Sequence, residues 1–125
     1  MLIQELTRRA STDFLARLRV GRLACAQGAQ PYVVPFYFAY DNDCIYSFSS
    51  AGKKIDWMRS NPLVCVQADE VAGAGNWTSV VAYGRYEELP DTDEMQNARA
   101  FACSLLQQRV LWWEPGAVKL KFLLI

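Results

Sequence analysis

The sequence predicts a mainly β (α+β) protein, an antiparallel sheet or barrel with a few peripheral helices. Two long runs, 30–40 and 77–89, are rich in the aromatic and β-branched residues that favour strands. Successive strands are mostly joined by segments too short for the crossover helices of a parallel sheet. With 125 residues, 52% of them hydrophobic, the chain has the size and apolar content of one domain, 1–125.

The first third of the chain is expected to form a short helix and two strands. Ser11 can cap the helix and Gly21 can end it. Residues 22–26 then predict one strand and residues 30–40 a longer one. Pro35 lies inside the longer run, and proline cannot donate a hydrogen bond to a sheet ladder. We therefore expect a bulge that leaves backbone groups free for a ligand, or a plain edge strand.

The rest of the chain alternates strands with short helices. The turn at 41–43 and the Asn61-Pro62 pair are typical element boundaries. After Pro90, the spacing of Asp91 and Glu94 is that of a capping box at the start of a helix. The expected elements are a strand at 44–49, a helix at 53–60, strands at 63–68 and 77–89, a loop at 73–76, an amphipathic helix after 91, a turn at 112–116 and a last strand at 117–125.

The overall charge argues against a nucleic-acid binder. Lys plus Arg and Asp plus Glu both number 13, so there is no basic excess. A near-neutral chain also lacks the charge repulsion that opposes self-association. No apolar run approaches the roughly 20 residues of a membrane span, and the start of the chain has no apolar leader segment. We therefore expect a cytoplasmic protein, not a membrane protein, with its four cysteines reduced.

The most restrictive feature of the composition is that the chain contains no histidine. This excludes Ser-His-Asp and Cys-His nucleophilic machinery, and also histidine-rich metal sites. The Glu87-Glu88 pair is expected to be a solvated strand end and not an acid/base pair. If the protein is an enzyme, a bound cofactor is therefore expected to supply the chemistry.

The segment best suited to ligand binding is Ser-Phe-Ser-Ser-Ala-Gly-Lys-Lys at 47–54, where a strand runs into a helix. A helix N-terminus offers unpaired N–H groups and a partial positive charge, so two lysines there are unfavourable unless an anion binds. The pattern is not a Walker A loop, because Lys54 stands where that motif has Ser or Thr. The segment indicates a phosphate site, with a solvated turn as the alternative.

Four segments together carry a family resemblance. They are Pro-Tyr-Val-Val-Pro-Phe-Tyr-Phe at 31–38, Ile-Tyr-Ser-Phe-Ser-Ser-Ala-Gly-Lys-Lys-Ile-Asp at 45–56, Arg-Ser-Asn-Pro-Leu-Val-Cys-Val at 59–66 and Trp-Thr-Ser-Val-Val-Ala-Tyr-Gly-Arg at 77–85. In order and spacing they resemble the pyridoxamine 5′-phosphate oxidase-like FMN-binding split-barrel family. Within it they are most similar to the branch that includes nitroimidazole-resistance proteins.

The resemblance implies a six-stranded split barrel and a homodimer with one FMN at each of two sites on the subunit interface. Ser47 and Ser49 would contact the FMN phosphate, and Lys53 and Lys54 would pair with it. The isoalloxazine ring would face the backbone around Val34, Pro35 and Phe36. Ser79 would approach the flavin from the partner subunit, and Trp77 and Trp113 would form walls of the pocket.

The implied activity is that of an FMN-dependent oxidoreductase, which passes electrons from a reduced nicotinamide to a small-molecule substrate. Two departures from the family pattern argue against oxidation of pyridoxamine phosphate itself: Val33 replaces a basic residue, and Phe48 stands in a tract where many relatives have histidine. Two alternatives remain, a flavin-binding protein without turnover and a degenerate barrel that acts as a dimeric interaction module. Zero histidine argues against a haem-binding relative, and zero net charge against an oligonucleotide-binding barrel.

Overall fold

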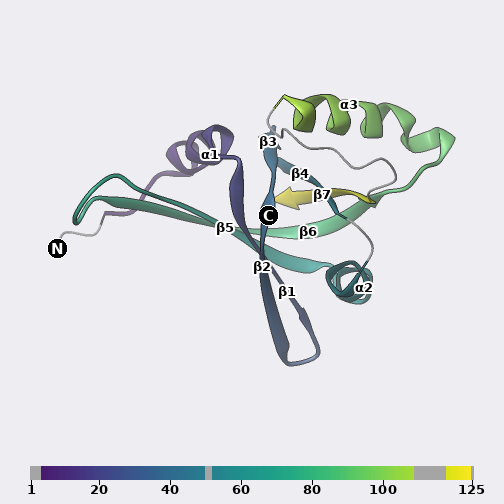
Figure 1. The fold of residues 1–125 in the computed structure, drawn as a ribbon, viewed down its shortest axis with the longest axis horizontal. Coiled ribbons are helices and arrows are strands. Elements are labelled where there is room, and N and C mark those ends of the chain that lie inside the picture. The colour runs from purple at the N-terminus through teal and green to yellow at the C-terminus, as the bar shows by residue number, and fades with distance from the viewer. Residues whose placement is uncertain (1–3, 50–51, 109–117, 125) are drawn as a thin grey trace.

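The computed structural model describes residues 4–49, 52–108 and 118–124, which form one curled sheet with three α-helices around it (Figure 1). The strands are β1 (Val20–Gln27), β2 (Gln30–Tyr37), β3 (Ala39–Asp41), β4 (Cys44–Ser49), β5 (Leu63–Val71), β6 (Trp77–Leu89) and β7 (Val118–Leu124). The helices are α1 (Arg8–Arg17), α2 (Lys53–Ser60) and α3 (Gln96–Gln107), with the short 3₁₀ helix η1 (Asp93–Met95) before α3. The strand order is β2-β1-β5-β6-β7-β4-β3, and the pairings between these described strands are antiparallel, as predicted.

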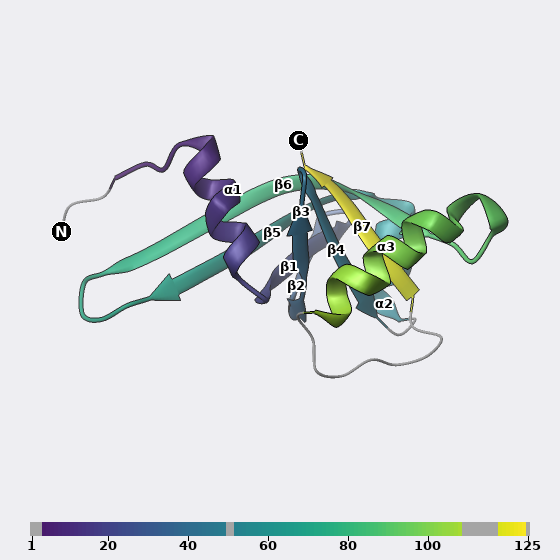
Figure 2. The ribbon, with the colours of Figure 1, turned by 90° about the horizontal axis from the view of Figure 1, so that it is seen from above.

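The two ends of the sheet approach each other, because β2 continues through Phe38 into β3. The Ser47 hydroxyl on β4 donates to the Tyr37 carbonyl at the end of β2 (2.6 Å). The Phe38 N–H donates to the Arg19 carbonyl (2.8 Å). The Phe38 ring is fully buried and stacks on Phe36, with ring centroids 5.6 Å apart. The sheet thereby curls around one apolar core, as the view in Figure 2 shows.

The structure has one strand more than the six predicted. The 30–40 run is two strands, β2 and β3, because Phe38 turns its ring into the core and its N–H to Arg19. The prediction that Pro35 lies on an edge strand is confirmed, since β2 ends the sheet order. There Pro35 faces Arg22 of β1, its neighbour in the sheet.

The first helix begins and ends earlier than predicted. Its cap is Thr7, whose hydroxyl accepts from the Ala10 N–H (3.1 Å), so Ser11 lies inside α1 and does not cap it. The helix ends at Arg17, with Leu18 as its C-cap, and not at Gly21. Gly21 is instead a buried residue of β1, where an added Cβ would lie 2.7 Å from the Gln67 carbonyl oxygen. Close packing between strands, not helix termination, explains the glycine.

The helical segment after Pro90 starts differently from the prediction. The predicted capping box does not form, because the Asp91 carboxylate accepts from the Gln96 side chain (2.7 Å). The chain passes through η1 before α3, which packs Ala102 and Leu106 against β4 and β6. The predicted turn at 112–116, with Trp113, lies outside the described residues. Within the described ranges, no helix is both long and apolar enough to cross a membrane.

The outer face of the sheet, on β1, β2, β5 and β6, carries many exposed apolar side chains beside the Arg22–Asp69 ion pair. Burial alternates along these strands, and their outward positions carry large exposed hydrophobic side chains. One row of paired residues crosses all four strands. It runs from Val33 of β2 (62% exposed) through Ala24 of β1 and Cys65 of β5 to Tyr83 of β6 (68% exposed). We call this surface the outer face; its large exposed apolar residues are Val20, Val33, Tyr37, Leu63, Val71, Trp77, Val81 and Tyr83.

Alkaline pH is expected to destabilise the fold through buried tyrosines. Burial, reinforced by Cys44, raises the pKa of Tyr46 from 10.0 to about 12. The folded chain therefore holds this proton more tightly than the unfolded chain does, and the stability due to Tyr46 is lost as pH rises from 10.0 towards about 12. Denaturant titrations across this window should show a falling free energy of unfolding. The fall should be shallower in Tyr46→Phe, and an equal fall in that variant would contradict the assignment.

Candidate functional site

The candidate site is built around the first turn of α2. The helix begins after Gly52 and buries Ile55 and Met58 completely. It ends at Ser60, and its C-cap is Asn61, whose N–H donates to the Trp57 carbonyl (2.7 Å). These contacts hold one face of α2 against the core. Lys53 and Lys54 are its first two residues, at the end where the helix dipole is positive. The structure thus places two cations at a helix start, a position where a bound anion is favourable.

Lys53 lies over two aromatic rings. Its Nζ is 5.6 Å from the ring centroid of Tyr32 and 5.6 Å from that of Trp57. The two rings themselves meet edge to face, with centroids 5.5 Å apart. Cation–π contacts of this kind hold an ammonium group in place without neutralising its charge. Lys53 is therefore an exposed cation with a restricted position.

Lys54 is half-buried at the other side of the same turn. Burial lowers the pKa of Lys54, while its neighbour Cys25 raises it slightly. Burial likewise raises the pKa of the Cys25 thiol, and Lys54 opposes that change. Within the described residues neither Lys53 nor Lys54 forms an ion pair. A bound anion would therefore match a charge that the described chain leaves unmatched.

The two predicted phosphate-binding serines differ in their surroundings. Ser47 is only 1% exposed, and its hydroxyl donates to the Tyr37 carbonyl. A hydroxyl has one proton to donate, so Ser47 would have to give up this bond to donate to a phosphate. Ser49 is half-buried and ends β4, three residues before Gly52. Ser49 therefore lies closer along the chain to the first turn of α2 than Ser47 does.

The predicted flavin-facing segment lies on edge strand β2. Val34 is half-buried and packs against the main core cluster. Pro35 is exposed on the outer face, and Phe36 turns its ring into the core against Phe122. Since the Phe36 side chain is buried, only its backbone can face a ligand, as the prediction requires.

Trp77 and Ser79 stand apart from α2 within one protomer. Both are exposed at the start of β6, and Figures 1 and 2 place that end of the β5–β6 hairpin far from α2. The Ser79 hydroxyl accepts from the Gln67 side chain (3.0 Å). Both residues line an open hollow of about 360 Å³, together with Gln4, Leu6, Gly75, Asn76 and Thr78. One protomer therefore brings the lysines, serines and β2 together but leaves Trp77 and Ser79 elsewhere.

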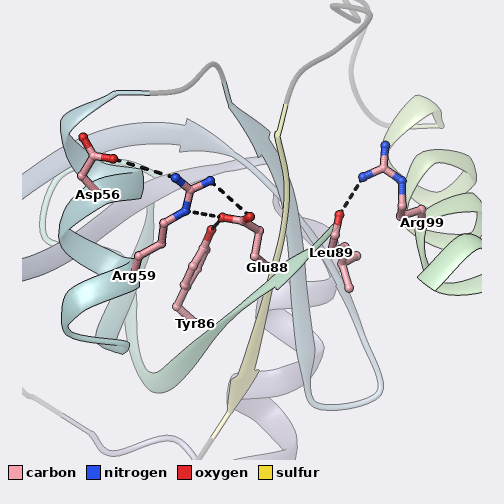
Figure 3. Close-up of polar contacts among 6 residues, drawn as sticks. All are labelled: Asp56, Arg59, Tyr86, Glu88, Leu89 and Arg99. Atoms are coloured by element: carbon pink, nitrogen blue, oxygen red, sulfur yellow. Dashed lines mark hydrogen bonds and ion pairs between the residues drawn. The ribbon is translucent and has the colours of Figure 1, made fainter. Parts of the chain in front are cut away.

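Sequence reasoning missed the polar cluster that ties α2 to β6, drawn in Figure 3. Arg59 of α2 donates two hydrogen bonds to the Glu88 carboxylate, and the Tyr86 hydroxyl donates a third to the same group. The expectation that Glu88 is a solvated strand end was wrong, because its side chain is 28% exposed and makes three hydrogen bonds. The only signal for this cluster in the sequence was an acidic residue, Glu88, close to an aromatic one, Tyr86, near the end of a predicted strand. Tyr32 was also missed as a contact of Lys53.

Comparisons with known proteins give consistent matches. Residues 7–117 match the family described as pyridoxamine 5′-phosphate oxidase. An uncharacterized protein of Rhizobium meliloti (strain 1021) is 44% identical over 119 residues, which are 95% of this chain and 79% of that protein. A crystal structure of an FAD-binding protein from Mesorhizobium loti is 49% identical, has a TM-score of 0.88, and covers 100% of this chain and 94% of its own.

A more distant structure shares the fold. A protein of Bacteroides thetaiotaomicron, described as a candidate 5-nitroimidazole antibiotic resistance protein, superposes with a TM-score of 0.74 over 94% of this chain and 80% of its own. At 18% identity this likeness supports the split-barrel fold alone. Taken with the family match, it confirms the split-barrel interpretation of the sequence.

Proposed function

The chain belongs to the pyridoxamine 5′-phosphate oxidase family, and from this premise we propose that it binds a flavin nucleotide, FMN, at the start of α2. Lys53 and Lys54 would hold the phosphate, with Ser49 beside them. The backbone of β2 around Pro35 would face the flavin ring. The FAD-binding relative from Mesorhizobium loti supports a flavin and makes FAD the competing nucleotide.

The observation that carries this proposal is the charge at the first turn of α2. A phosphate monoester carries about −1.5 to −2 charges at pH 7, which matches two lysines. Half-buried Lys54 loses hydration without gaining an ion pair in the described part of the chain. The backbone N–H groups of the first turn, which no side chain caps in the described part of the chain, would add donors for the phosphate oxygens. These features fit the terminal phosphate of FMN.

We propose that the protein is a homodimer with a flavin site at each end of the subunit interface. The outer face exposes eight large apolar residues. Single hydrophobic residues scattered on a surface need no explanation, but a set of this size on one face indicates an interaction surface. A second copy packed on this face would bury them. It would also bring the partner's Trp77 and Ser79 to a site that one protomer leaves incomplete.

The bound flavin would supply redox chemistry by accepting hydride from a reduced nicotinamide and passing electrons to a small acceptor. The chain itself would bind the phosphate, orient the ring along β2 and shield it from water with aromatic side chains. Hydride transfer to a flavin needs no protein acid, so a chain without histidine is suited to it. We therefore propose an oxidoreductase and not a hydrolase or a proton-transfer enzyme.

The first test is an absorption spectrum of the purified protein before and after incubation with FMN, or separately with FAD, and removal of the excess. Retained flavin bands with FMN are expected, with weaker retention of FAD. Preferential retention of FAD would overturn the assignment to FMN while keeping the flavin site. A spectrum that stays featureless after both additions would overturn flavin binding.

Turnover needs a separate test once flavin binding is established. The loaded protein is mixed with NADH or NADPH and then with a quinone or a nitro compound, and nicotinamide oxidation is followed at steady state. Continuous oxidation that depends on the acceptor is the expected result. Flavin that is reduced once, with no continued turnover with any acceptor, would instead identify a flavin-binding protein without enzymatic activity.

A further inference from the structure

The cluster of Arg59, Glu88 and Tyr86 connects the C-terminal end of α2 to the end of β6 (Figure 3). Arg59 donates from Nε to Glu88 Oε1 (2.9 Å) and from Nη2 to Glu88 Oε2 (3.2 Å). The Tyr86 hydroxyl donates to Glu88 Oε1 (2.7 Å). Asp56, also on α2, adds a weak contact to Arg59 (4.0 Å). We call Arg59, Glu88 and Tyr86 the α2 clamp.

The geometry of the clamp suits orientation better than stability. An exposed ion pair contributes little to stability, and Arg59 is an exposed residue. A two-pronged contact between a guanidinium and a carboxylate, however, fixes direction as well as distance. Glu88 is itself held by Tyr86, which is 8% exposed and packs against Phe122 with ring centroids 5.9 Å apart. The carboxylate is thus a rigid point to which α2 is attached.

The orientation of α2 decides where its lysines lie. Arg59 and Lys53 are six residues apart on an eight-residue helix, which is about 9 Å along the axis. A rotation of about 10° around that axis would move a side-chain group by about 1 Å. Binding sites work when their groups are held within about 0.5 Å of the productive position. Without the clamp, α2 would be held by the buried side chains of Ile55 and Met58 and by the contact of Trp57 with Tyr32, which restrict this rotation less than a two-pronged polar contact does.

We propose that Arg59, Glu88 and Tyr86 are positioning residues that fix the rotation of α2 and so aim Lys53 and Lys54 at a phosphate group. This inference rests on the proposed function. None of the three residues needs to touch the ligand, because they act through the helix. The clamp should therefore affect recognition of the phosphate and not of the flavin ring.

The test compares FMN with riboflavin, which has the same ring system and no phosphate. Binding of each is measured by flavin fluorescence in the wild type, in Arg59→Lys and in Glu88→Gln. Arg59→Lys keeps the positive charge but removes the paired donors of the guanidinium. Glu88→Gln keeps the shape of the side chain but removes the negative charge. The preference for FMN over riboflavin should fall about tenfold in each. Riboflavin affinity and the denaturation midpoint should be nearly unchanged.

The matched control is Arg99→Lys. Arg99 donates to the carbonyl of Leu89 (2.6 Å), the residue next to Glu88, but it comes from α3 and not from α2 (Figure 3). This variant should keep the full preference for FMN. The double variant of Arg59→Lys with Glu88→Gln should lose no more than the larger single effect, since both changes break one contact.

The possible outcomes separate the clamp from the phosphate site. If the wild type prefers FMN and the clamp variants keep this preference, the positioning role of the clamp is overturned and the proposed function stays intact. Equal losses for FMN and riboflavin, with a lower denaturation midpoint, would assign the cluster a purely structural role and also overturn the inference. A wild type without any preference for FMN would overturn the phosphate site itself, and the clamp with it.

Discussion

The double variant Lys53→Ala with Lys54→Ala is expected to bind FMN about 2–5 kcal/mol more weakly than the wild type. Both charges lie at the start of α2, and each would lose a charge-assisted hydrogen bond to the phosphate. Lys54→Ala alone should account for the larger share, because Lys54 is half-buried and its charge is less screened by water. Fluorescence titration of FMN, with riboflavin in parallel, measures the effect.

A matched control for this experiment is present in the same chain. Arg8 and Arg9 are the first two residues of α1, so they also place two cations at a helix N-terminus. The double variant Arg8→Ala with Arg9→Ala should bind FMN as the wild type does. If the lysine variant keeps its affinity for FMN, or loses affinity for riboflavin equally, the phosphate assignment at α2 is wrong.

The elements with strong local boundaries were predicted with their observed limits. The strand at 44–49, the helix at 53–60 and the strand at 77–89 are β4, α2 and β6. Asn42 and Asp43 adopt positive φ angles of 46° and 59°, which few residues other than Asn, Asp and Gly tolerate. Asn61-Pro62 ends α2 because proline disfavours helical backbone in the residue before it. These signals need no knowledge of the tertiary structure.

The helix starts were less predictable because several residues could serve as the cap. Thr7 and Ser11 are both good capping residues, and in the folded chain Thr7 caps the helix that buries Phe14 and Leu15. After Pro90, the Asp91 carboxylate is drawn to Gln96 and Arg99 instead of to its own backbone. Competing side-chain partners are set by tertiary contacts, which a local pattern does not contain.

Only part of the candidate site could be predicted, for the same reason. Residues 47–54 form one continuous segment, so strand, turn and lysines could be recognised together. The partners of that segment come from far along the chain, as with Arg59 and Glu88, which are 29 residues apart. They meet only because the sheet brings the end of β6 beside α2. Family resemblance supplied residue roles, but it did not supply these contacts.

The variant Tyr83→Asp is expected to dissociate the proposed homodimer. Tyr83 is 68% exposed in the protomer and ends the row that crosses the outer face, so folding of the single chain should tolerate the change. In a dimer packed on this face, the new carboxylate would be buried without a partner. Removing such a charge from water should raise the dimer dissociation constant by about a hundredfold or more. Light scattering after size-exclusion chromatography measures the mass.

The same variant tests whether the flavin site needs both subunits. If Trp77 and Ser79 of one protomer complete the site of the other, Tyr83→Asp should lose FMN affinity together with the dimer. The control is Phe101→Asp, an exposed aromatic residue on α3 whose ring meets Tyr46 of β4, a strand outside the four that form the outer face; this variant should remain dimeric and bind FMN. A monomeric variant that still binds FMN as the wild type does would keep the outer face as the dimer interface but place the whole flavin site within one protomer. A wild type that is already monomeric would contradict the dimer itself, and the eight exposed apolar residues would then need a different partner.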